Sequence, residues 1–110
     1  MEDNKKALSM ISMSKRAGKL VMGFKAVKEN IENGKACLVV VTRDTSPKTI
    51  KEVVFAAHKE SPVSVRMVNA SQEEIGKAVG RKAGVLCILD PELSKAVERL
   101  TSPVTKEECR

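Results

Sequence analysis

The chain has 110 residues, of which 42% are hydrophobic and 31% charged, and it carries a net charge of +6. This length supports one folded domain, and the composition argues against an intrinsically disordered chain. No apolar run reaches the roughly 20 residues that a membrane-spanning helix needs, and the N-terminus lacks the apolar core of a signal peptide. We therefore expect a cytoplasmic protein with one domain over residues 1–100, followed by a frayed tail over residues 101–110.

Two helices are predicted in the first third of the chain. Residues 4–16 place apolar side chains at helical spacing, and Gly18 follows where a helix commonly ends. A short apolar run separates this segment from residues 23–33, which predict a second helix closed by Gly34. The apolar face of the second helix consists of Phe24, Val27 and Ile31.

Strands and helices alternate along the rest of the chain. Continuous apolar runs at residues 37–41 and 85–89 predict strands buried on both faces, and alternation at residues 63–67 predicts a strand with one exposed face. Capping residues and prolines predict the intervening helices, which end near residue 60, cover residues 71–79, and run from residue 90 to about residue 100. The alternation predicts an α/β fold, a three-layer α/β/α sandwich around a small four-stranded mixed sheet.

The positive charge is concentrated in the first half of the sequence. Residues 1–51 contain eleven Lys and Arg against five Asp and Glu, whereas residues 52–110 contain nine of each. A one-sided basic excess favours a polyanion partner. With two Phe and neither Trp nor Tyr, the chain lacks the aromatic platforms on which RNA-recognition-motif sheets and oligonucleotide-binding barrels stack bases. We therefore expect structured RNA to be recognised by helix N-termini, glycine-bearing loops and cationic side chains.

The sequence shows little sign of catalytic or metal chemistry. The single histidine, His58, falls on the polar side of a predicted helix and has no orienting partner in a local motif. Cys37, Cys87 and Cys109 show no metal-ligand spacing, and the first two lie in apolar runs, where a free thiol behaves as a small hydrophobic residue. We expect no enzyme activity, no cofactor, no metal and a reducing environment.

Gly23 stands at the start of the predicted second helix. A residue without a side chain at this position lets a nucleic-acid backbone approach the free N–H groups and the positive end of the helix dipole. Lys25 and Lys28 follow on the exposed side of the next turn. An alternative is that these lysines pair with Glu29 and Glu32 at i, i+4, which contributes only about 0.2–0.5 kcal/mol per pair.

Three ordered segments resemble the ribosomal protein L7Ae/L30e family, in particular its small stand-alone bacterial members. These segments are K-R-A-G-K-L-V-M-G-F-K-A-V-K, then N-G-K-A-C-L-V, and later I-G-K-A-V-G-R-K-A-G-V-L-C-I-L-D-P. The likeness runs from about residue 8 to residue 100. It implies a non-enzymatic α/β/α sandwich that recognises kink-turns, which are sharply bent RNA internal loops with sheared G·A pairs.

The resemblance also implies where RNA is contacted. One contact set is the start of the second helix: Gly23, Phe24, Lys25, Ala26 and Glu29. A second set is the loop before the last strand: Arg81, Lys82, Ala83, Gly84 and Val85. Nearby positions are Lys19, Asp44 and Lys48, and Lys28 joins them as a further cation on the second helix.

Our leading prediction is a ribosome-associated, ribosomal-protein-like protein that binds a kink-turn or similarly bent RNA, as a monomer and without a membrane partner. The alternative is a protein-interaction or assembly module on the same fold, with only non-specific RNA affinity. The alternative rests on Ala26 and Glu29, because related kink-turn binders usually carry polar and basic side chains at these two positions.

Overall fold

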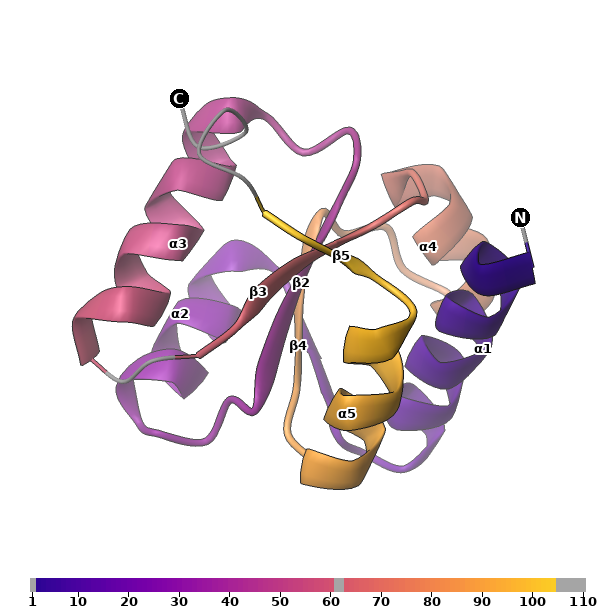
Figure 1. The fold of residues 1–110 in the computed structure, drawn as a ribbon, viewed down its shortest axis with the longest axis horizontal. Helices are drawn as coiled ribbons and strands as arrows, with labels where there is room; N and C mark the ends of the chain where they lie inside the picture. Colours follow the sequence, from indigo (N-terminus) through magenta and orange to yellow (C-terminus); the bar gives the residue numbers. More distant parts are fainter. Residues whose placement is uncertain (1, 61–62, 105–110) are drawn as a thin grey trace.

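The computed structural model describes residues 2–60 and 63–104, which form a five-stranded sheet between two layers of helices (Figure 1). The strands are β1 (Leu20–Met22), β2 (Leu38–Thr42), β3 (Val65–Val68), β4 (Val85–Ile88) and β5 (Ser102–Pro103). The helices are α1 (Glu2–Arg16), α2 (Phe24–Glu32), α3 (Pro47–Glu60), α4 (Gln72–Val79) and α5 (Pro91–Arg99). The predicted α/β sandwich is therefore confirmed.

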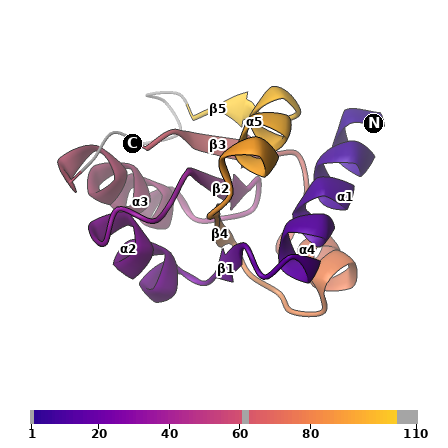
Figure 2. The ribbon, with the colours of Figure 1, turned by 90° about the horizontal axis from the view of Figure 1, so that it is seen from below.

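The sheet is covered on both faces (Figure 2). Helices α2 and α3 lie on one face, where Val39 and Val41 of β2 join their core cluster. Helices α1, α4 and α5 lie on the other face, where Leu38 and Val40 of the same strand are buried. Successive strand residues point to opposite faces, so a strand buried on both faces must be apolar throughout. Each fully buried Val or Leu side chain stabilises the fold by roughly 1.5–3 kcal/mol.

The strand order β1-β4-β2-β3-β5 determines which loops lie side by side. Strand β4 runs antiparallel to both of its neighbours, β1 and β2, whereas β2 and β3 are parallel. The start of β4 therefore lies between the ends of β1 and β2. There, the N–H of Gly23 donates to the carbonyl of Val85 at 2.8 Å, and the N–H of Thr42 donates to the carbonyl of Gly84 at 3.0 Å.

The prediction of four strands is wrong by one, because β5 pairs antiparallel with β3 at the start of the segment expected to fray. Arg66 of β3 holds this segment in place. Its guanidinium donates to the carbonyl of Glu98 at 2.8 Å, to the hydroxyl of Thr101 at 3.2 Å, and to the Thr101 carbonyl. The end of α5 is thus capped by a cation from a neighbouring strand. Residues 105–110 lie outside the described residues.

Of the two cysteines that lie in apolar runs, Cys87 is buried as expected but Cys37 is exposed. Cys87 lies in the core, and its burial, helped by the nearby Cys37, raises the pKa of its thiol to about 12. Cys37 is exposed, because β2 begins only at the next residue, and its Sγ is 3.4 Å from the carbonyl oxygen of Leu89. Cys109 lies outside the described residues.

Candidate nucleic-acid interface

One edge of the sheet gathers the ends of strands and the starts of helices. Strands β1, β2 and β3 end there, helices α2, α3 and α4 begin there, and β4 begins there between β1 and β2 (Figure 1). The N-terminus of a helix carries a partial positive charge and N–H donors that no carbonyl of the same helix accepts. The backbone alone therefore makes this edge favourable to anions.

The start of α2 is shaped by Gly23. This residue is the N-cap of α2 and adopts φ 96° and ψ 143°, a conformation that side-chain-bearing residues rarely reach. No side chain caps the helix, and no acidic residue stands in its first turn. The first N–H groups of α2 consequently have no side-chain acceptor at the place where a ligand backbone has room to approach.

A hollow of about 370 Å³ lies beside this helix start and is called the Asp44 hollow below. It unites segments far apart in the sequence, namely the start of α2, the loop after β2, the start of α4 and the start of β4. Its lining residues are Gly23, Phe24, Asp44, Thr45, Ser46, Thr49, Gln72, Gly84 and Val85.

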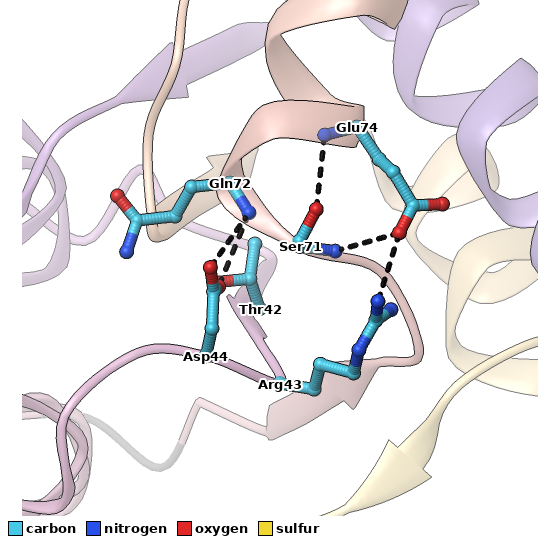
Figure 3. Close-up of polar contacts among 6 residues, drawn as sticks. All are labelled: Thr42, Arg43, Asp44, Ser71, Gln72 and Glu74. Atoms are coloured by element: carbon cyan, nitrogen blue, oxygen red, sulfur yellow. Dashed lines mark hydrogen bonds and ion pairs between the residues drawn. The ribbon is translucent and has the colours of Figure 1, made fainter.

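Asp44 ties two of these segments together (Figure 3). Its carboxylate accepts a hydrogen bond from the Thr42 hydroxyl at 2.7 Å and from the N–H of Gln72 at 3.1 and 3.3 Å. The Thr42 hydroxyl is the main cause that holds the pKa of Asp44 below its ordinary value of 3.8; desolvation opposes it and the Gln72 N–H reinforces it. The ionised carboxylate therefore anchors the loop after β2 to the first turn of α4.

The start of α4 is fixed by a capping box. The Ser71 hydroxyl accepts from the N–H of Glu74 at 3.1 Å, and the Glu74 carboxylate accepts from the N–H of Ser71 at 3.2 Å (Figure 3). The same carboxylate lies 3.1 Å from the guanidinium of Arg43. These contacts join α4 to the residues that follow β2, so the wall of the Asp44 hollow is held from two sides.

Residue 84 must be a glycine because the side chains of Thr45 and Gln72 lie close to its backbone in this wall. A Cβ at this position would lie 2.6 Å from Oγ1 of Thr45 and 3.2 Å from the side-chain amide of Gln72. The Thr45 hydroxyl donates to the Gly84 carbonyl at 2.8 Å. Any side chain at residue 84 would push Thr45 or Gln72 aside and distort the hollow.

A second hollow, of about 400 Å³, lies on the other side of Gly23 and is called the Arg81 hollow. Arg81 comes from the loop before β4, and its guanidinium nitrogen would lie 4.0 Å from a Cβ built on Gly23. The two segments predicted as contact sets therefore meet around the start of α2. The hollow is lined by Met22, Gly23, Phe24, Lys25, Ala26, Glu29 and Arg81.

Other predicted site residues lie outside both hollows. The carbonyl of Lys19 accepts from the N–H of Leu89, at the opposite end of β1 from Gly23, about 13 Å away at the usual strand rise. Lys82 turns toward α4, where its Cγ would be 2.9 Å from a Cβ on Gly76. Lys28 faces a groove between α2 and α3.

Two further members of the predicted set cannot offer side chains to a ligand. Ala83 and Val85 are only 8% and 3% exposed, because both pack into the core. Their contribution to an interface is limited to the backbone. Lys48, by contrast, stands exposed in the first turn of α3, where its neighbours Ser46 and Thr49 line the Asp44 hollow.

Sequence reasoning missed the polar wall of the Asp44 hollow, formed by Thr45, Ser46, Thr49 and Gln72. The S-Q-E-E capping box indicated that a helix begins at Ser71, but it did not indicate where that helix start lies. The location follows from the parallel pairing of β2 with β3, which brings the ends of both strands together and which no local pattern encodes.

Residues 2–60 and 63–104 carry few features of other functional classes. In this range no group of three or more His, Cys, Asp or Glu side chains could hold a metal ion. His58 is exposed on α3. Among the described helices, none combines the length and apolar character needed to cross a membrane.

The sequence matches the profile of the ribosomal protein L7Ae/L30e/S12e/Gadd45 family over residues 5–98. The chain belongs to this family. Among its relatives, RNA-binding protein YlxQ of Enterococcus faecium is 32% identical over 99 residues, which cover 89% of this chain and 93% of that protein. The large ribosomal subunit protein eL30 of Pyrobaculum islandicum is 38% identical over 86 residues, or 74% of this chain and 84% of that protein.

Two solved structures share the fold of this chain. A protein of unknown function from Bacillus halodurans C superposes with a TM-score of 0.79 at 26% identity, covering 86% of this chain and 95% of that one. The Giardia lamblia 15.5kD RNA binding protein gives a TM-score of 0.74 at 18% identity, covering 91% and 85% of the two chains. The second likeness concerns the fold alone.

Proposed function

We propose that this L7Ae/L30e-family protein binds structured RNA at the start of α2 and that its preferred ligand is a kink-turn or similarly bent RNA. The observation that carries the proposal is the convergence of both predicted contact sets on an uncapped helix start. Relatives named as RNA-binding and as large-subunit ribosomal proteins support it. We further propose that the protein acts in the cytoplasm as a non-enzymatic monomer, on ribosomal or other RNA.

The two hollows suggest different tasks in binding. Around the Arg81 hollow, Lys25 and Arg81 supply cationic side chains that can contact phosphates. Around the Asp44 hollow, Asp44 and Gln72 supply polar groups that can meet the edges of unpaired bases. Gly23 lies between them and lines both. A bent RNA fits this arrangement because its backbone turns sharply while its bulged bases project away.

The proposal is tested by competition between a kink-turn RNA and a plain duplex of equal length. We expect the kink-turn RNA to bind more tightly at physiological salt, because only a bent backbone reaches both hollows. Fluorescence anisotropy over a series of salt concentrations would measure both affinities. Equal competition by the two RNAs would instead favour the protein-interaction module with non-specific RNA affinity.

Lys25→Ala provides the first residue-level prediction. Loss of one phosphate contact should weaken binding to the kink-turn RNA and lower the slope of log K against log salt by about one unit. Lys95→Ala is a matched control, since Lys95 is an exposed lysine on α5, which covers the other face of the sheet. Equal affinity and slope in wild type and Lys25→Ala would remove Lys25 from the interface.

A further inference from the structure

A groove of about 520 Å³ runs between α2 and α3, on the helical layer next to the two hollows. We call it the phenylalanine groove, because both phenylalanines of the chain line it. Its volume lies in the range of small-ligand clefts. The lining residues are Phe24, Lys28, Glu32, Lys51, Glu52, Phe55, Ala56 and Lys59.

Phe55 is the most conspicuous residue of this groove. Its side chain is 67% exposed, more than the other exposed large hydrophobic residue of the described chain, Met13, at 43%. Exposure of an aromatic ring on the middle of a helix brings no packing benefit to the isolated protein. An exposed ring inside an apolar groove is suited to stacking against another flat ring.

Cations surround the ring. Lys51 and Lys59 stand one turn before and one turn after Phe55 on the same face of α3, and Nζ of Lys59 is 6.0 Å from the ring centroid. Lys28 faces them from α2. Against these three lysines the groove has two carboxylates, Glu32 and Glu52, so its lining carries a net charge of +1. A flat apolar partner with negative charges complements this surface.

We propose that the phenylalanine groove receives unpaired nucleotides that flank the bent RNA, with one base stacked on Phe55 and the adjoining phosphates beside Lys51 and Lys59. Base stacking on an aromatic side chain beside lysines is the usual way in which single-stranded nucleic acid is held. An RNA occupant is favoured over an acidic peptide by continuity, because Phe24 lines this groove and both hollows. The inference rests on the proposed function, since it extends the same RNA along the α2 surface.

The test compares a blunt-ended kink-turn RNA with the same RNA carrying a short single-stranded uridine extension, at the 5′ or the 3′ end. We expect one extension to tighten wild-type binding by about fivefold or more, the gain from stacking one base. Phe55→Ala should lose that gain and keep its affinity for the blunt RNA. Phe55→Trp should retain the gain, as should the control Met13→Ala, which removes an exposed hydrophobic side chain from α1.

A direct readout comes from the ring protons. The chain contains two Phe and one His as its only aromatic rings, so an NMR spectrum of this region is simple enough to follow each ring. Free oligouridine should shift the Phe55 ring signals of the wild-type protein. The NMR measurement tests the groove proposal alone, because oligouridine contains no kink-turn. In the competition experiment, by contrast, equal binding of the blunt kink-turn RNA and the duplex contradicts only the proposed function.

Three results would overturn the groove proposal. The first is an extension that adds nothing to wild-type binding at either end. The second is a Phe55→Ala variant that weakens extended and blunt RNA equally, and the third is an unchanged ring spectrum with oligouridine. After the first or third result the exposed ring would be better explained by a protein partner, whereas the second would show that Phe55 supports binding of the kink-turn itself.

Discussion

The starts of α2 and α5, two described helices of equal length, are capped in different ways. Both helices have nine residues. In α5, the Asp90 carboxylate accepts from the N–H groups of Glu92 and Leu93 at 2.8 and 3.0 Å, and a proline occupies the first turn. In α2, Gly23 offers no side-chain acceptor. The start of α5 is satisfied within the protein, whereas the first N–H donors of α2 have no side-chain acceptor.

This difference separates what stabilises a helix from what makes it useful. A capping side chain contributes about 0.5–2 kcal/mol relative to Ala but only a few tenths of a kcal/mol relative to Gly, so α2 loses little stability by beginning after Gly23. Helix α2 is held instead by its buried face, where Val27 and Ile31 pack against α3 and the sheet. A helix anchored by its buried side can leave its start uncapped. Two substitutions test this comparison directly, and a third, at Asp44, extends it to the start of α4.

Gly23→Ala should have the largest effect, because it should lower both stability and RNA affinity. Forcing a side chain into φ 96° costs about 1–3 kcal/mol of stability, measured by urea unfolding. The added methyl group also enters the space between the hollows, so affinity for a kink-turn RNA should fall by about tenfold or more. Gly34→Ala is the control, because Gly34 also has a positive φ, of 71°, and open space around it, but lies beyond the other end of α2. Loss of RNA affinity in Gly34→Ala as well would show that strain alone explains the effect.

Asp90→Ala should have an intermediate effect and only on stability. Removing the acceptor for two N–H groups should lower the free energy of unfolding by about 1 kcal/mol. RNA affinity should stay unchanged, because α5 lies on the opposite face of the sheet from α2. Asp90→Asn keeps a capping oxygen and should recover most of the lost stability. A clear loss of RNA affinity in Asp90→Ala would contradict the division of roles.

Asp44→Asn should have the smallest effect and should depend on pH. The lowered pKa of Asp44 means that the folded state favours the ionised form, so its contribution is present above its ordinary pKa and is lost as pH falls through the lowered value. Wild type should therefore exceed the variant in stability near neutrality, and the difference should shrink in acid. Thr42→Ser, which retains the donating hydroxyl, serves as control in urea titrations at several pH values. A difference that is constant down to acid pH would contradict the anchoring role of Asp44.

Most helices and strands could be predicted from local patterns, because burial and capping leave a recognisable pattern within a single segment. The apolar run of β4 requires cover on both faces, and Ser71 with Glu74 forms the capping box that its spacing predicted. The short β5 could not be predicted, since its pairing depends on Arg66, which lies 35 residues away from Thr101. Contacts between distant segments leave no periodic trace in the sequence.

The candidate site was predicted in part for the same reason. Gly23 and Lys25 were recognisable from a glycine and a cation at a helix start, and the 81–85 loop came from the family resemblance. Lys19 did not join them, because β1 carries it to the opposite end of β4. Gln72 and Thr45 went unnoticed because ordinary polar residues acquire a role only when strand order brings them together.

The two-residue strand β5 has a consequence for the behaviour of the protein in crowded solution. It lies outermost beside β3 and includes Pro103, which has no N–H to donate to a further strand. At the other side of the sheet, the outermost strand is β1, with only three residues. Both edge strands therefore offer few backbone groups with which a strand of another chain could pair. A basic protein that meets its polyanion at high local concentration can in this way gather on RNA without growing into β-aggregates.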